Sequence, residues 1–243
     1  MRVLFAVVLC LLLLLKNKIF DSGLVLAETE CIRDHTFIAS DWYNNLLASD
    51  KQLRDYVLGI SAWLIDGIAV YCALKWYLSH SSLRVIITAT MVYIIRLHLQ
   101  DLFFLSFPKS WLWEDPEWFS VTVAYHKTAD FYYSGHVALC TTIITEMWAT
   151  KDYKAYYFSV IVMLIEATML CFTRVHYIID LVAGYFCAKY YSVGAEIIAF
   201  FWDVWLLGLP AHKRHNYYFR SCSKCGWSND CAVALIDEQE LAL

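Results

Sequence analysis

Two short stretches of the sequence place a histidine beside a long hydrophobic segment. Residues 130–137 are DFYYSGHV, which contains His136, and residues 173–181 are TRVHYIIDL, which contains His176. An ionisable side chain next to a segment that can span a bilayer is costly, and such residues usually serve a function. The two stretches therefore predict histidine chemistry at the ends of membrane helices.

Asp180 follows His176 by four residues. Residues four apart share one face of a helix, so the carboxylate can hold one imidazole nitrogen and leave the other free to attack an electrophile. Spacing alone does not decide this assignment, because His126 and Asp130 have the same spacing. Either pair can also be a polar helix end near the lipid headgroups with no catalytic role.

The residues next to the two histidines favour phosphate as the electrophile. Gly135 permits close approach of the backbone to an anion, and Ser134 can donate to a phosphate oxygen. Arg174 and Arg96 carry guanidinium groups that can neutralise phosphoryl oxygens, although Arg96 can instead belong to a buried polar network between helices. These residues predict a site for a phosphate ester.

This set of side chains suits a two-step phosphoryl transfer that needs no metal and no cofactor. His176 would take the phosphoryl group, and His136 would protonate the departing alkoxide. His136 would then deprotonate the incoming hydroxyl group, which completes the transfer.

The composition places these residues in a membrane protein. Of the 243 residues, 60% are hydrophobic and 17% are charged, and the mean hydropathy is +0.49. Such values are typical of polytopic membrane proteins. The net charge of −4 is small, and no basic run interleaved with aromatic residues occurs, so we exclude nucleic acid as a partner.

We predict an all-α fold, a polytopic membrane protein with a six-helix transmembrane bundle. Residues 2–15 suit either a signal peptide or a short first membrane helix, and we favour the helix. The next spans approach the length that a bilayer requires. They are residues 56–78, 85–106, 134–149, 155–173 and 176–192.

Loop charges predict which side of the membrane holds the histidines. Lysines and arginines gather between the second and third spans, between the fourth and fifth, and after the sixth. These connections are expected in the cytosol, with a cytosolic N-terminus and with residues 193–209 not crossing the membrane. The loop 107–133 is more acidic and is expected on the lumenal or external face, in the endoplasmic reticulum, the Golgi or the plasma membrane. Both histidine motifs then lie on that face.

The chain divides into three predicted parts. Residues 1–55 form the first membrane helix or signal anchor and a lumenal segment, residues 56–192 form the catalytic membrane domain, and residues 193–243 form an interfacial helix and a cytosolic tail. The run 193–209 can instead be a seventh span. In the tail, Cys222, Cys225 and Cys231 could bind zinc together with His215, but lipid attachment or reduced thiols are the favoured interpretation.

The two histidine stretches, preceded by FPKSWLWEDP, resemble the sphingomyelin synthase and phosphatidylcholine:diacylglycerol cholinephosphotransferase branch of the lipid phosphatase (PAP2-like) superfamily. The resemblance covers roughly residues 45–192. It implies that His136, His176 and Asp180 form the catalytic triad, and that Asp130 matches the acid before the first histidine motif. It also implies a six-helix membrane bundle that works without metal.

The sequence departs from the sphingomyelin synthases at some of these positions. Thr128 and Ala129 stand where those enzymes have Cys-Gly, and Ile178 replaces the threonine common after His-Tyr. Arg174 is more similar to the cholinephosphotransferase of glycerolipids. The upstream Lys…Arg-Pro motif of phosphatases that act on soluble headgroups does not occur in the sequence, which favours transfer over hydrolysis.

The resemblance therefore implies a lipid headgroup phosphotransferase that moves phosphocholine, or a similar phosphoalcohol, from a phospholipid donor to diacylglycerol or ceramide. The alternative is a lipid phosphate phosphatase with water as acceptor, and a third candidate is a catalytically silent protein that binds or moves lipids. The sequence does not distinguish choline from ethanolamine or inositol, nor diacylglycerol from ceramide, and it leaves the oligomeric state open.

Overall fold

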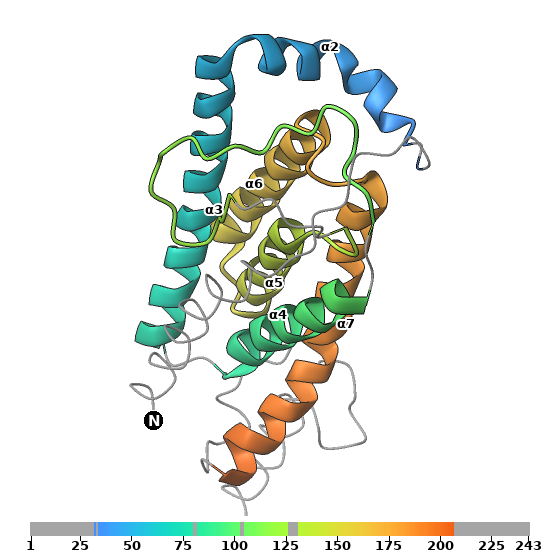
Figure 1. Cartoon of the computed structure of the whole chain (residues 1–243). Helices are drawn as coiled ribbons and strands as arrows, with labels where there is room; N and C mark the ends of the chain where they lie inside the picture. Colours follow the sequence, from blue (N-terminus) through green and yellow to red (C-terminus); the bar gives the residue numbers. More distant parts are fainter. Residues whose placement is uncertain (1–31, 33, 80–81, 103–104, 126–130, 207–243) are drawn as a thin grey trace, which may run out of the picture.

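The computed structural model describes residue 32 and residues 34–79, 82–102, 105–125 and 131–206 of the chain. In this part the regular elements are helices throughout, which confirms the all-α prediction for the described residues. Figure 1 shows the arrangement. The elements are α2 (Thr36–Ser49), α3 (Lys51–Ser79), α4 (Arg84–Leu102), α5 (Gly135–Ala149), α6 (Tyr153–Phe172), α7 (Ile178–Phe200) and a π-helical turn (Phe201–Leu206).

Each predicted span after the first coincides with one of the helices α3 to α7. Two helical stretches of the described part, Lys51–Leu78 and Tyr153–Phe172, are long and apolar enough to cross a membrane. The predicted first helix at 2–15 and the cysteine-containing tail lie outside the described residues. A bundle of six spans therefore stays a prediction.

Several helix boundaries differ from the expected ones. Helix α3 begins at Lys51 and not at residue 56, α4 ends at Leu102 and not at residue 106, and two further differences affect the packing. The sequence pattern around residues 42–53 is typical of one amphipathic helix, but α2 ends at Ser49 and α3 begins at Lys51. Asp50 separates them, because its N–H donates to Leu46 O at 3.0 Å and its carboxylate accepts from Leu53 N at 3.0 Å. As a result α2 turns away from α3 and lies across one end of the bundle (Figure 1).

The second difference concerns α7, which we expected to end near residue 192. It continues without a break to Phe200 and into the π-helical turn. Ala195, Glu196 and Ala199 are buried, so the packed face of α7 also continues past that point. The boundary that we placed at residue 192 does not coincide with a helix end.

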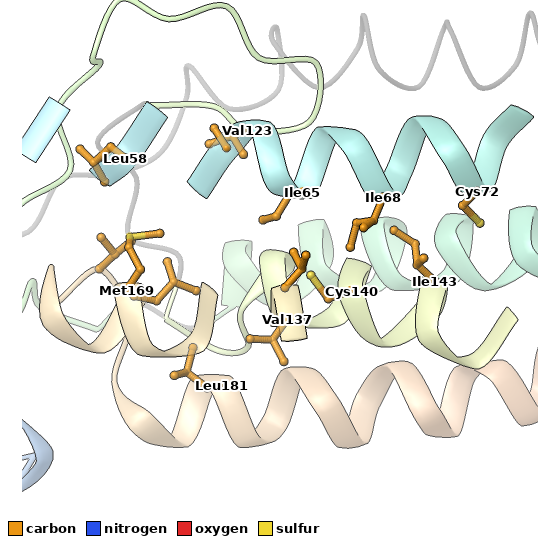
Figure 2. Packing of buried hydrophobic residues seen from close by; sticks show 14 of the residues in the cluster. Leu58, Ile65, Ile68, Cys72, Val123, Val137, Cys140, Ile143, Met169 and Leu181 are labelled. Atoms are coloured by element: carbon orange, nitrogen blue, oxygen red, sulfur yellow. The ribbon is translucent and has the colours of Figure 1, made fainter. Parts of the chain in front are cut away.

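Helix α5 is the central element of the bundle and contacts α3, α4, α6 and α7. Most of its residues are buried, as expected for a helix that is apolar around its circumference. Its three buried threonines, Thr141, Thr142 and Thr145, each donate to the carbonyl four residues earlier, which satisfies their hydroxyl groups. Figure 2 shows side chains of α3, α5, α6 and α7 meeting in the shared core.

The segment 105–125 connects α4 to α5 by way of α3. Asp66 on α3 accepts from Val121 N and Thr122 N, both at 2.8 Å, and Trp63 Nε1 donates to Phe119 O at 3.0 Å. The sequence shows Asp66 as an isolated acid within a span, and the structure gives it a partner in this loop. The second half of the loop thus runs along α3 (Figure 1).

A buried ion cluster joins α4, α5 and α7. Arg84 contacts the carboxylate of Glu146 at 2.7 Å and that of Glu196 at 2.9 Å, and all three residues are buried. Glu146 follows His136 by ten residues on α5, a helical rise of about 15 Å. The cluster therefore fixes the helices at the end of α5 far from the histidine.

Candidate active site

The two histidine motifs meet at the N-terminal ends of α5 and α7. Ser134 is the N-cap of α5, and its side chain accepts from Val137 N at 3.4 Å. Its own backbone N–H donates to Asp180 O at 2.9 Å, which ties the first motif to the second. The hydroxyl group of Ser134 is fully buried and caps the helix, and a contact with a phosphate oxygen stays a prediction.

Gly184 allows this close approach of the two helices. A Cβ atom at residue 184 would lie 2.7 Å from the carbonyl oxygen of Ser134, closer than any real side chain comes. The second motif can therefore pack directly on the cap of α5. The glycine lies one turn after Asp180 on the same helix.

His176 and Asp180 form the pair that the spacing predicts. His176 Nδ1 lies 3.5 Å from Asp180 Oδ2, and both side chains are buried. The same carboxylate oxygen accepts from Tyr177 N at 3.1 Å, so Asp180 also holds the first turn of α7. A distance of 3.5 Å is long for a hydrogen bond, and a catalytic role of this pair stays a prediction.

Arg96 packs against the first histidine motif. A Cβ atom on Gly135 would lie 2.8 Å from the Arg96 guanidinium carbon, so the glycine makes room for this cation at the start of α5. Arg96 is also within electrostatic range of His176. It is a buried cation on α4 beside the predicted nucleophile, as a phosphate site requires.

His136 is half buried in the first turn of α5. Its ring packs edge to face with that of Trp113 at a centroid distance of 5.5 Å. Trp113 comes from the loop 105–125. Tryptophans in a loop beside membrane spans are typical of an aromatic belt at the membrane surface, so sequence reasoning missed the part of Trp113 in the site. No local pattern in the sequence places this loop against α5.

The structure places Arg174 on the side of the turn that faces α2. Its guanidinium pairs with Asp41 and donates to Phe37 O at 3.2 Å and Lys109 O at 3.1 Å. Its backbone has φ of 55°, in the left-handed region that side chains other than glycine seldom adopt. Arg174 therefore positions the turn before His176, and direct contact with substrate stays a prediction.

Asp34 is a second residue that sequence reasoning missed. Its carboxylate accepts from Ile178 N at 2.7 Å, at the N-terminus of α7 beside the site. Burial raises the pKa of Asp34, but hydrogen bonds from Ile178 and Thr36 outweigh that effect, so the pKa lies below its ordinary value. An ionised carboxylate thus caps α7, through a contact across 144 residues that no local pattern could indicate.

The sequence also predicts a reaction that needs no metal and a role for Asp130 before the first histidine motif. The described residues contain no group of three or more His, Cys, Asp or Glu side chains that could hold a metal ion. Asp130 and His126 lie outside the described part of the chain, as do Cys222, Cys225 and Cys231 with His215. Their predicted roles are therefore unchanged.

Comparison with known proteins gives the family. No curated protein and no solved structure matches the chain. The family model described as AtPDCT1/2, that of phosphatidylcholine:diacylglycerol cholinephosphotransferase-like proteins, matches residues 33–196. This range covers more than half of the sequence and includes α2 to α6, both histidine motifs and most of α7. The chain belongs to the AtPDCT1/2 family.

Proposed function

We propose that the protein is a membrane-embedded cholinephosphotransferase that moves phosphocholine between phosphatidylcholine and diacylglycerol. The family membership supports a lipid function of this type. The observation that carries the proposal is the hydrogen bond from Ser134 N to Asp180 O, because it joins the two histidine motifs into one site. Neither motif alone could both accept a phosphoryl group and move a proton.

In the first step His176 Nε2 attacks the phosphorus atom of phosphatidylcholine. Asp180 faces Nδ1 and stabilises the positive charge that develops on the ring. The bond between phosphorus and the glycerol oxygen breaks, and His136 donates a proton to the departing oxygen of diacylglycerol. Arg96 balances the charge on the phosphoryl oxygens.

In the second step another diacylglycerol enters the site. His136, now neutral, removes the proton from the acceptor hydroxyl, and the acceptor oxygen attacks phosphorus. The bond between phosphorus and His176 breaks, which releases a new phosphatidylcholine and restores both histidines. No water molecule takes part in the reaction, and the second step is chemically the reverse of the first.

We further propose that residues 2–15 together with α3 to α7 form the six-span bundle of the PAP2-like superfamily. The charge distribution among the loops supports a site on the lumenal or external face. A lipid alcohol can then reach the site from within the membrane. Ceramide, which also offers a primary hydroxyl group, is a second acceptor to test.

The test uses purified protein in liposomes that contain phosphatidylcholine labelled in its headgroup and unlabelled diacylglycerol of distinct chain length. We expect the label to appear in phosphatidylcholine that carries the new chains. His176→Ala should abolish this product, and His98→Ala is the control because His98 is an exposed histidine on α4. Label that accumulates only as free phosphocholine or phosphate would instead identify a hydrolase.

A further inference from the structure

Helix α6 carries a buried carboxylate that the proposed reaction does not use. Glu166 lies in the C-terminal half of α6 with none of its surface exposed. One carboxylate oxygen accepts from Ser61 Oγ on α3 at 2.5 Å. The other oxygen, Oε2, is buried and has no hydrogen-bond partner among the described residues. A buried acid with an unused oxygen is costly, and in a membrane bundle it marks a functional site.

Two aromatic rings connect Glu166 to the catalytic histidine. Trp113 packs against His136 at 5.5 Å and against Tyr125 at 4.7 Å between ring centroids. Tyr125 lies within electrostatic range of Glu166, and its hydroxyl group donates to Leu58 O at 3.0 Å, one turn before Ser61 on α3. The rings thus extend from the site toward the carboxylate.

Helix α5 also links His136 to the region of Glu166. Cys140 follows His136 by one helical turn and also lies within electrostatic range of Glu166. Figure 2 shows Cys140 and Leu58 in the core that α3, α5 and α6 share. His136, the two aromatic rings and the carboxylate therefore belong to one region of the bundle interior.

We propose that Glu166, Trp113 and Tyr125 form the subsite that recognises the quaternary ammonium group of choline. This inference rests on the proposed function and specifies how that same site selects its headgroup. A quaternary ammonium group has no N–H to donate, so it is bound by aromatic faces and by an opposite charge. Its positive charge would balance the buried carboxylate in the complex.

The groups of phosphocholine follow one another in the same order as the side chains that would bind them. In the proposed reaction the phosphate binds beside His176 and Arg96, and a two-carbon link leads from the phosphate ester to the ammonium group. His136 contacts Trp113 directly, so the link would pass beside His136 toward the aromatic rings and Glu166. Phosphatidylethanolamine has a smaller, strongly hydrated ammonium group and would bind less well against an aromatic face.

A purely structural role for Glu166 predicts a different outcome. The contact with Ser61 joins α3 to α6, and a glutamine in place of Glu166 would keep that hydrogen bond while it removes the charge. A structural role is therefore preserved in Glu166→Gln, whereas a charge that binds choline is lost. Headgroup selectivity, measured as a ratio within one reaction, separates the two roles even where the yield of protein changes.

The experiment supplies equal amounts of phosphatidylcholine and phosphatidylethanolamine, with different headgroup labels, to the full-length protein in liposomes with diacylglycerol. For Glu166→Gln we expect the ratio of choline to ethanolamine transfer to fall about tenfold, as the loss of a desolvated cation contact implies. Trp113→Leu should change the ratio in the same direction. The control is Glu146→Gln, another buried acid far from the histidines, which should leave the ratio unchanged.

A binding measurement separates this subsite from the transfer reaction. Purified protein is titrated with dihexanoyl phosphatidylcholine and with dihexanoyl phosphatidic acid, and affinity is measured by calorimetry. The wild type should prefer the choline lipid, and Glu166→Gln should lose that preference. An unchanged donor ratio and an unchanged preference in Glu166→Gln would overturn the subsite, whereas choline binding that depends on Glu166 without any transfer would overturn only the proposed function.

Discussion

Asp180 makes contacts that hold the fold, and in the proposed reaction the same side chain also takes part in the chemistry. Its carboxylate holds Tyr177 N in the first turn of α7 and faces the imidazole of His176. Its backbone carbonyl accepts from Ser134 N, which brings the first motif to the second. A change at this residue must therefore be chosen so that the structural contacts survive.

Asp180→Asn is the variant that makes this distinction. The amide oxygen can still accept from Tyr177 N, but the negative charge opposite His176 is lost. We expect transfer to fall by a factor of about 100 or more, because the ring loses the charge that stabilises it. The thermal stability of the purified protein should change little, and near-normal turnover in this variant would remove Asp180 from the catalytic triad.

The residues of the candidate site could be predicted in part from the sequence. His136, His176 and Asp180 stand in short motifs whose spacing is local, and the structure brings these motifs together. Asp34 and Trp113 contact the site across large separations, so no local pattern could assign them. Glu166 could have been noticed as an acid inside an apolar span, but its partner Ser61 is 105 residues away.

At the level of helices, the site depends on the close approach of α5 and α7. Gly184 faces the backbone carbonyl of Ser134, and the two helices also share the core around Val137 and Leu181. Because a carbonyl oxygen cannot move as a flexible side chain can, a methyl group on residue 184 would push the helices apart. His136 and His176 would then no longer be placed for one phosphorus atom.

Gly184→Ala should therefore reduce transfer more than it reduces stability. A displacement of about 1 Å at reacting groups can lower a rate by a factor of about 100. The matched control is Gly67→Ala on α3, since a Cβ atom there meets nothing within 4 Å. This control should be active and slightly more stable, by about 1 kcal/mol, because alanine favours helix. Equal activity of both variants would show that helix spacing does not limit the reaction.

The turn between α5 and α6 carries an acid-sensitive contact. Hydrogen bonds from Lys75 and Tyr71 lower the pKa of Asp152 to about 2, from an ordinary value of 3.8. A lowered pKa in the folded state means that the contact stabilises the protein fully above pH 4 and that this stabilisation is lost as the pH falls toward 2. The contact joins the C-terminal part of α3 to this turn.

Asp152→Asn should remove this part of the acid sensitivity. Melting temperatures of the wild type and the variant, measured in detergent from pH 7 to pH 2, should differ most at pH 7 and converge as the pH approaches 2. A constant difference across that range would contradict a role for the ionised carboxylate. Asp115→Asn is the control, because Asp115 is an exposed acid in the loop 105–125.

Helix positions followed well from the sequence, since apolar runs of sufficient length form helices both in a bilayer and in a packed bundle. The break at Asp50 was missed because the residues on either side favour helix equally, and a single cap divides them. The continuation of α7 past residue 192 was missed because Glu196 resembled an interfacial residue, whereas it pairs with Arg84 from α4. Both differences arise from individual polar contacts.

For the whole molecule, the proposed orientation places the histidine end of the bundle on the lumenal or external side. Single cysteines introduced at residues 110 and 151, in a background without exposed thiols, would be labelled by a membrane-impermeant reagent. We expect residue 110 to react from the lumenal or external side and residue 151 from the cytosol, as the loop charges indicate. Labelling of residue 110 from the cytosol would reverse the orientation and place the chemistry on the other leaflet.

The central claim is that His176 carries the headgroup as a covalent intermediate. The direct measurement is mass spectrometry of the peptide that contains His176, after brief incubation with phosphatidylcholine in the absence of diacylglycerol and digestion at neutral pH. We expect a phosphocholine adduct on His176 in the wild type, no adduct in His176→Ala, and loss of the adduct when diacylglycerol is added. An adduct on another residue, or transfer at full rate by His176→Ala, would contradict this mechanism.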